Sequence, residues 1–218
     1  MTQFFDVTLR LLEGFKENCF LFGMTLLMAL PLGLIISFGS MSKFLPLKLL
    51  CRAFVWIIRG TPLILQLFVV FYIPPMLTNG DFSIDDRMTA SLVAFVINYA
   101  AYFSEIYRGG IESIPKGQYE AGYVLGMKKS QIFFKVVLLQ VIKRIIAPMS
   151  NEIITLVKDT SLAFAIGVAE MFSTAKALAA REGSMIPFLL AGAFYWLFNM
   201  VVEVIMDRVE KKLDYYHD

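Results

Sequence analysis

Three polar side chains on one apolar stretch form the first group in this sequence whose types and spacing suit chemistry. Asn98, Tyr102 and Glu105 follow one another at spacings of four and three residues, so on a helix they share one face. Together they present an amide, a phenol and a carboxylate, each of which can hydrogen-bond a small polar molecule. We predict that these three residues line a site for such a ligand.

Two of these residues also have a purely structural interpretation, which the sequence leaves open. At a helical rise of about 1.5 Å per residue, Asn98 lies about 15 Å from Met88, where the apolar stretch begins, and Glu105 lies about 26 Å from it. Asn98 either contacts the ligand or hydrogen-bonds a neighbouring helix. Glu105 either binds a cationic group or pairs with Arg108 or Arg59.

A second polar group is the run Lys158-Asp159-Thr160-Ser161. Consecutive residues point around a helix, so the four side chains cannot all line one surface. A charge at the centre of a membrane helix costs about 2.5–3.5 kcal/mol on the insertion scale, so a retained charge usually faces an interior or an aqueous cavity. We predict that Asp159 binds an ammonium group, with a fixed ion pair to Lys158 or another lysine as the alternative. Thr160, Ser161 and the backbone near Leu162 are then candidates to receive a carboxylate.

The composition places these polar residues in a membrane protein. Of the 218 residues, 58% are hydrophobic and 17% are charged, whereas soluble domains contain about 45–50% apolar residues. No charge interrupts the 25 residues between Glu17 and Lys43, and about 20 residues suffice to cross a bilayer. The net charge of +2 gives no overall field that favours nucleic acid. We predict that the chain contacts a lipid bilayer and no nucleic acid.

The pattern predicts an all-α, polytopic membrane protein with five transmembrane helices in a single domain. The predicted spans cover residues 18–41, 53–73, 88–109, 148–169 and 184–206. Residues 1–17 carry one apolar and one charged stripe, which indicates an amphipathic helix in the membrane interface. Residues 111–147 are predicted to form a short helix, a turn at Gly126 and a second helix capped by Ser130.

Lysine and arginine residues in the connections set the predicted orientation. The connection between the first two spans carries Lys43, Lys48 and Arg52 without an acidic residue, and residues 111–147 carry six basic residues. Both connections are therefore predicted to be cytoplasmic. Five spans then place the N-terminus outside the cell and the C-terminus in the cytoplasm.

Several chemistries lack the residues that they require. Cys19 and Cys51 have no CxxC partner and the lone histidine is His217, so we predict neither a disulfide framework nor a metal site. Residues 122–130 contain glycine, lysine and serine, but not at the spacing of a P-loop. An intramembrane enzyme needs a nucleophile with a base, and the predicted spans contain no histidine. We predict that the chain is not an enzyme.

The segment 119–126 carries the most specific motif. Its run Glu120-Ala121-Gly122-Tyr-Val-Leu-Gly126 resembles the EAA loop of the membrane subunits of bacterial ABC importers, which seats in a groove of the ATPase subunit. Gly122 replaces the second alanine of that pattern, and Leu139 replaces a later proline. The resemblance implies a set of ATPase-coupling residues: Tyr119, Glu120, Ala121, Gly122, Leu125 and Gly126.

Other motifs narrow the resemblance to polar amino-acid permeases of the histidine, arginine and glutamine type. These motifs are Arg59-Gly60-Thr61-Pro62 with Gln66, the run NYAAYFSEIYRGGIESIPKGQYEAG, and the segment from Lys158 to Leu162. The likeness covers nearly the whole chain, and it implies the MetI-like fold of type I ABC importers in the bacterial cytoplasmic membrane. In this family the segment 158–162 belongs to the substrate pocket.

The resemblance also implies a transport complex. Its partners are two ATP-binding-cassette ATPase subunits, a second permease copy or paralogue, and an extracytoplasmic amino-acid-binding protein. ATP and magnesium bind to the ATPase subunits, and the permease itself binds no cofactor. Alternating access driven by ATP hydrolysis then moves the substrate inward.

The two acidic residues Glu105 and Asp159 favour a basic amino acid such as arginine, histidine or lysine as the substrate. A permease for glutamine or glutamate is an alternative, because the same motifs occur in such permeases. A small-solute or ion channel is a further alternative, which would need the charged face but no segment for docking an ATPase.

Overall fold

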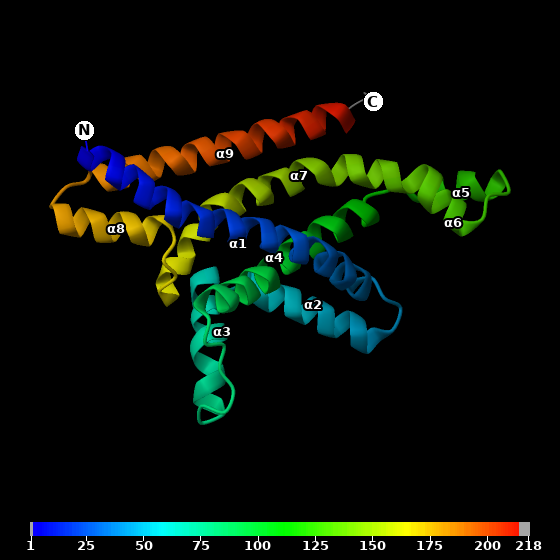
Figure 1. Ribbon diagram of the computed structural model, residues 1–218. Helices are drawn as coiled ribbons and strands as arrows, with labels where there is room; N and C mark the ends of the chain where they lie inside the picture. Colours follow the sequence, from blue (N-terminus) through cyan, green and yellow to red (C-terminus); the bar gives the residue numbers. More distant parts are fainter. Residues whose placement is uncertain (1, 214–218) are drawn as a thin grey trace.

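The computed structural model describes residues 2–213, and every regular element in this range is a helix. His217 lies outside the described residues. The N-terminal end of α1 (Thr2–Ser40) lies at one end of the molecule, and the short helices α5 (Lys116–Val124) and α6 (Lys129–Ile132) lie at the other (Figure 1). The prediction of an all-α fold is confirmed.

α1 is one continuous helix of 39 residues with Pro31 inside it. The predicted apolar stripe of its first half, Phe5, Leu9 and Leu12, is exposed. Val7 and Leu11, on another face of the same helix, are buried against α8 (Met171–Glu182) and α9 (Ile186–Leu213), an intramolecular contact that the sequence did not reveal. The structure has no break between residues 17 and 18, where the predicted interfacial helix and first span were to meet.

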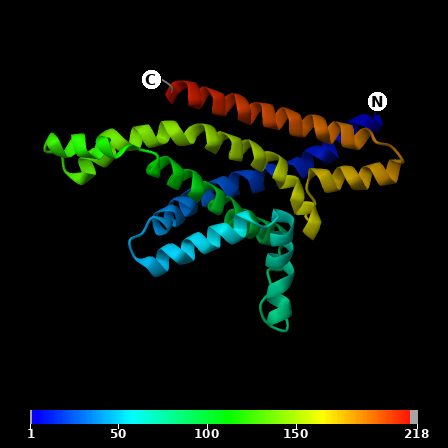
Figure 2. The ribbon, with the colours of Figure 1, turned by 180° about the vertical axis from the view of Figure 1, so that it is seen from behind.

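The second predicted span is a bent pair of helices. α2 (Leu45–Arg59) and α3 (Leu63–Leu77) meet at an angle of 108°, with the break at residues 60–62. Pro62 precedes α3 in an extended conformation with φ −63° and ψ 138°, and a proline there also restricts the residue before it to non-helical conformations. As a result α3 points away from the other helices in both views (Figures 1 and 2).

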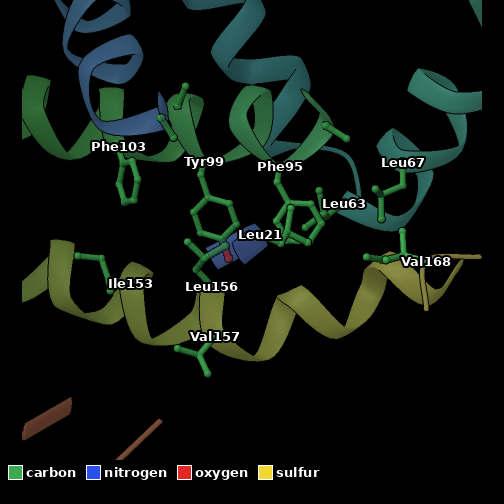
Figure 3. Close-up of a cluster of buried hydrophobic side chains, with 14 of the residues drawn as sticks. Leu21, Leu63, Leu67, Phe95, Tyr99, Phe103, Ile153, Leu156, Val157 and Val168 are labelled. Carbon is green, nitrogen blue, oxygen red and sulfur yellow. The ribbon is translucent and has the colours of Figure 1, made fainter. Parts of the chain in front are cut away.

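The main core lies between α4 (Arg87–Glu112) and α7 (Leu138–Asp159). On α4 the aromatic rings of Phe95, Tyr99 and Phe103 recur at helical spacing and are buried. Figure 3 shows them facing α7, with Leu156 among the residues opposite. α1 packs closely on the same helix, because a Cβ added at Gly33 would lie 2.9 Å from the Ala100 carbonyl oxygen of α4. Glycine permits this close approach of the two backbones.

The segment between α4 and α7 contains the predicted short helix and turn. Gly126 ends the turn after α5 with a φ of +73°, a conformation that favours glycine. The next helix is capped by Lys128 rather than by the predicted Ser130, because the Lys128 backbone N–H already binds the Gln131 side chain. A π-helical turn, η1 (Phe133–Val137), then leads into α7.

The fourth predicted span is divided in the structure. α7 ends at Asp159, the 3-10 helix η2 (Thr160–Ile166) continues from it, and Gly167 ends η2 with a φ of +81°. By length and composition, α1, α4 and α9 can cross a membrane as single helices, and α2 with α3 can cross as a bent pair. α7 does not meet this criterion of length and composition, because it carries five charged residues: Lys143, Arg144, Glu152, Lys158 and Asp159. Four of the five predicted spans thus correspond to helices that are long and apolar enough by this criterion.

Candidate functional site

Asp159 lies at the C-terminal end of α7, beside the core. Its Oδ2 atom accepts a 2.8 Å hydrogen bond from the hydroxyl of Tyr99, which is 2% exposed. Its Oδ1 atom accepts no hydrogen bond from the residues that the structure describes. Glu152 lies seven residues earlier on α7, which places the two acidic side chains on one face of the helix, about 10 Å apart along its axis. Both are half-buried, and Oδ1 of Asp159 is available to a cation.

Asn98 makes the interhelical hydrogen bond that the sequence left open. Its Nδ2 atom donates to Oε1 of Gln66 on α3 over 3.0 Å. The Gln66 amide nitrogen in turn donates to the carbonyl oxygen of Ile58 at 2.8 Å and to Oγ1 of Thr61 at 2.9 Å. Gln66 thereby links the end of α2 and the break after it to Asn98 on α4. Asn98 directly precedes Tyr99 in the sequence. The bond fixes the broken helix next to the acidic pair.

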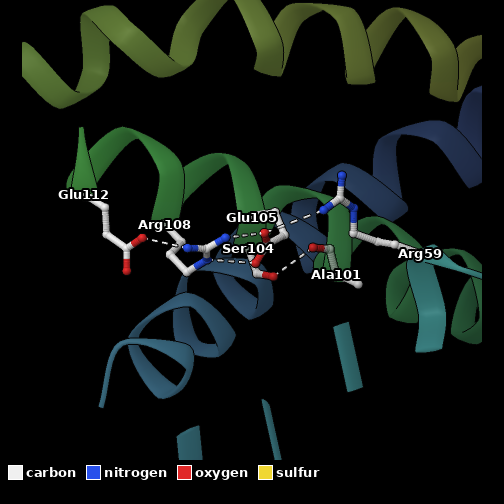
Figure 4. Close-up of polar contacts among 6 residues, drawn as sticks. All are labelled: Arg59, Ala101, Ser104, Glu105, Arg108 and Glu112. Atoms are coloured by element: carbon white, nitrogen blue, oxygen red, sulfur yellow. Dashed lines mark hydrogen bonds and ion pairs between the residues drawn. The ribbon is translucent and has the colours of Figure 1, made fainter. Parts of the chain in front are cut away.

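Glu105 is held by arginine side chains (Figure 4). Arg108 donates to both carboxylate oxygens, from Nε at 2.9 Å and from Nη2 at 2.6 Å, and its Nη1 donates to Glu112 at 2.6 Å. Nη1 of Arg59 lies 3.6 Å from Glu105 Oε2, and the Arg59 guanidinium stands 5.1 Å from the centre of the Tyr102 ring. Of the two interpretations of Glu105, the structure shows the ion pair with arginine.

The run from Lys158 to Leu162 does not converge on one surface, as helical geometry requires. Thr160 points toward α1, where its Oγ1 atom accepts from Asn18 at 3.1 Å. Ser161 donates to the backbone carbonyl of Lys158 at 2.8 Å, and Lys158 itself is exposed. Leu162 packs on the edge of the main core. Within this run, Asp159 accepts a hydrogen bond from α4, donated by the Tyr99 hydroxyl.

A buried polar network on the far side of Thr160 was not found by sequence reasoning. Glu170 is 1% exposed, and its carboxylate accepts from the backbone N–H groups of Phe172 at 2.7 Å and Ser173 at 2.6 Å. It also accepts from Asn18 at 3.2 Å and from the Tyr195 hydroxyl at 3.1 Å. This network joins α1, the start of α8 and α9. The available signal was an acidic residue directly before a helical run, where a carboxylate can accept from the free backbone N–H groups of the first turn.

The coupling segment presents an exposed apolar tip. Val124 and Leu125 are 88% and 77% exposed, while Glu120 and Ala121 are also exposed. Gly122 is buried instead, and a Cβ added there would lie 2.6 Å from Ile132. The glycine that departs from the EAA pattern therefore lets α5 pack directly on α6. Tyr119 packs against the small hydrophobic cluster beneath the tip, which contains Ile132.

Similarity to a known family decides what this chain is. A family model for the binding-protein-dependent transport system inner membrane component matches residues 29–215. The chain belongs to this family. It is the permease subunit of an amino-acid ABC importer, an inner-membrane transport component whose ATPase activity lies in partner subunits.

Individual relatives agree with this assignment. The L-cystine transport system permease protein TcyB of Bacillus subtilis is 40% identical over 90% of this chain and 81% of its own length. The arginine transport system permease protein ArtQ of Bacillus subtilis is 34% identical, and the glutamine transport system permease protein GlnP of Escherichia coli is 33% identical. In both cases the match covers 93% of this chain and 92% of the relative.

Solved structures confirm the MetI-like permease fold. A crystal structure of an amino acid ABC transporter with histidines matches with a TM-score of 0.85 and 28% identity, over 94% of each chain. An inward-facing structure of the MetNI methionine ABC transporter matches with a TM-score of 0.66 at 17% identity, over 93% of this chain and 94% of its own. The family description adds that such permeases belong to binding-protein-dependent transport systems, so an ATPase and a binding protein are the implied partners.

Proposed function

We propose that this permease binds the α-ammonium group of a polar amino acid at Asp159, beside Glu152 and Tyr99. The observation that carries the proposal is the incomplete set of partners around Asp159: one oxygen binds the Tyr99 hydroxyl and the other accepts nothing from the described residues. A half-buried carboxylate is costly without a cation, so a cationic ligand is favoured there. Asn98 and Tyr102, on the same helix as Tyr99, form the adjoining wall.

We further propose a basic amino acid, such as arginine, histidine or lysine, as the favoured substrate. Asp159 and Glu152 give the site two negative charges, of which one matches the α-ammonium group and the other a cationic side chain. Glu105 contributes less to this choice than the sequence suggested, because two arginines already neutralise it. The relatives' names cover cystine, arginine and glutamine, which all carry an α-ammonium group. Glutamine or glutamate stays the alternative.

The proposed mechanism is alternating access driven from the coupling segment. ATP and magnesium bind to two ATPase subunits and not to this chain, and the permease pairs with a second copy or a paralogue. The exposed tip at Val124 and Leu125 docks on the ATPase, and α7 connects that segment directly to Asp159. We propose the orientation that the basic connections predict: the coupling segment faces the cytoplasm, and the start of α1 lies outside the cell.

The test is uptake by the permease reassembled in proteoliposomes with its ATPase and receptor. Labelled arginine, histidine, glutamine and glutamate are offered to the wild type and to the variants Asp159→Asn and Glu105→Gln. We expect the highest uptake for a basic amino acid and at least about a tenfold loss in Asp159→Asn, since a charge-assisted contact is worth about 1.5–3 kcal/mol. Unchanged uptake by Asp159→Asn would refute the ammonium site, and preferred uptake of glutamate would refute the basic substrate.

A further inference from the structure

We infer that the permease carries a second ligand site, built on α2, which holds the carboxylate of the amino acid on its way out toward the coupling-segment side. This inference rests on the proposed function, because it assumes an amino acid as the cargo. The site is a cavity of about 460 Å³ between α2 and α4. Its lining combines guanidinium groups with a tryptophan ring: Arg52, Val55, Trp56, Arg59, Gly60, Glu105 and Arg108.

Two of the three arginines have donors to spare. Arg108 is occupied by Glu105 and Glu112 through three hydrogen bonds of 2.6 to 2.9 Å. Arg59 reaches Glu105 only at 3.6 Å, and Arg52 makes no hydrogen bond or ion pair with the described residues. A planar guanidinium group can bind a carboxylate through two parallel hydrogen bonds. Arg59 and Arg52 are therefore the groups available to an anion.

The charge on this face of α2 argues against a surface that simply faces lipid, since Arg52, Trp56 and Arg59 are all exposed in the single chain. Arg52, Trp56 and Arg59 recur at spacings of four and three on one face of α2, so that face carries two charges. Arg59 also stands over the Tyr102 ring, which connects the cavity with the wall of the proposed ammonium site. Charges that are retained on a membrane helix usually face an aqueous cavity or the protein interior. The cavity is thus a continuation of the substrate path.

The cavity also lies on the coupling-segment side of the acidic pair. Arg52 is seven residues from the start of α2, and Glu105 is seven residues from the end of α4. At about 1.5 Å per residue, Arg52 lies about 10 Å from the start of α2 and Glu105 about 10 Å from the end of α4, the helix ends nearer to the coupling segment. An amino acid that leaves Asp159 in this direction meets Arg59 and Arg52 next, and its carboxylate can compete with Glu105 for Arg59.

The experiment uses the intact permease–ATPase complex in nanodiscs of zwitterionic lipid. Fluorescence from Trp56 is isolated as the difference between the complex and its Trp56→Phe variant. The probes are arginine, histidine, glutamine and their C-terminal amides. We expect a saturable change in the Trp56 signal with the amino acid that is best transported and none with its amide, which lacks the carboxylate. An equal response to acid and amide would overturn the inference.

Variants of Arg59, Lys48 and Asp159 show which side chains the Trp56 fluorescence change depends on. Arg59→Gln is expected to weaken half-saturation about tenfold, which corresponds to about 1.4 kcal/mol, and Arg59→Lys to restore part of it. Lys48→Gln, on the same helix but outside the cavity lining, is the matched control and should respond as the wild type does. Asp159→Asn should retain the Trp56 response, because Asp159 does not line the cavity. A response that survives Arg59→Gln would contradict the assignment of the carboxylate to this guanidinium.

A lipid phosphate is the other anion that could reach these arginines, and adding anionic phospholipid to the nanodiscs tests it. A Trp56 change that appears only with this lipid would overturn the amino-acid site. Uptake measured on the same preparation distinguishes the two proposals. Normal uptake without a Trp56 response contradicts the second site alone, whereas absence of amino-acid uptake contradicts the proposed function itself.

Discussion

Two carboxylates near the ends of η2 have very different surroundings. Glu170 is 1% exposed and accepts hydrogen bonds from two backbone N–H groups, an amide and a phenol. Asp159 is half-buried and accepts one hydrogen bond, from Tyr99. A carboxylate whose partners are complete stabilises the fold, while one with a free oxygen can bind a ligand. The contrast separates a structural acid from a functional one in the same membrane protein.

The largest expected effect on stability comes from Glu170→Ala. The change leaves the backbone N–H groups of Phe172 and Ser173 without their acceptor inside the protein, whereas the Asn18 amide keeps Thr160 as an acceptor. We expect a loss of about 3 kcal/mol or more, because each buried unsatisfied donor costs about 1–3 kcal/mol. Thermal unfolding of the purified complex measures it. Tyr195→Phe, which removes a single hydroxyl, is the milder control.

Uptake by the folded fraction of the Glu170→Ala complex provides a second comparison of Glu170 with Asp159. Its KM for uptake should equal that of the wild type, because Glu170 contacts helix ends and not the acidic pair. A stable Glu170→Ala complex with a much higher KM would show that the two acids have been assigned the wrong way round.

Asp159→Asn should give the opposite pattern. Uptake is expected to fall at least about tenfold, through loss of the charge that binds the ammonium group. The melting temperature should stay close to that of the wild type, since the asparagine can still accept the Tyr99 hydroxyl. A melting temperature as low as that of Glu170→Ala, together with normal uptake in the folded fraction, would make Asp159 a structural residue.

Gly122→Ala tests packing in the coupling segment. The added Cβ would lie 2.6 Å from Ile132, and such overpacking typically costs about 1–3 kcal/mol. We expect weaker retention of the ATPase during co-purification, with partial recovery in the double variant Gly122→Ala, Ile132→Val. Gly117→Ala is the matched control, because nothing lies within 4 Å of a Cβ there. Full ATPase retention by Gly122→Ala would contradict the tight α5–α6 contact.

The smallest effect is expected at Asp86, an exposed helix cap that contrasts with the buried cap Glu170. Asp86 accepts from the Thr89 side chain at 2.5 Å and from the Thr89 backbone at 2.9 Å, and these hydrogen bonds lower the pKa of its carboxyl group. Asp86→Ala should cost about 1 kcal/mol and Asp86→Asn almost nothing, because asparagine caps equally well.

The pH dependence of this cap follows from the lowered pKa. The stabilisation by Asp86 is complete above the ordinary pKa of an aspartate and is lost as the pH falls through the lowered value. The stability difference between the wild type and Asp86→Asn should therefore change only at acidic pH. A difference that grows as the pH rises from neutral would contradict the capping role.

Much of the fold followed from the sequence because hydropathy and helix-ending residues are local signals. The charge-free stretches predicted α1 and α9, and Gly126 predicted the turn after α5. The bend at Pro62 and the packing of the first turns of α1 on α8 depend on contacts distant in sequence, so hydropathy did not reveal them.

The site was predicted in part for the same reason. Helical spacing placed Asn98, Tyr102 and Glu105 on one face, but it did not show that Arg108 and Arg59 neutralise Glu105. Asp159 was predicted from the cost of a charge in an apolar stretch. Its partner Tyr99 lies 60 residues away in sequence, a pairing that only tertiary structure brings about. Sequence thus indicated the residue types of the site more reliably than their partners.

The most direct test of the functional carboxylate is equilibrium binding of labelled arginine and glutamine to the purified permease–ATPase complex without its receptor. The wild type should bind arginine, Asp159→Asn should bind it at least about tenfold more weakly, and the folded fraction of Glu170→Gln should bind it as the wild type does. Equal binding by the wild type and Asp159→Asn would contradict the assignment of Asp159 as the ammonium ligand.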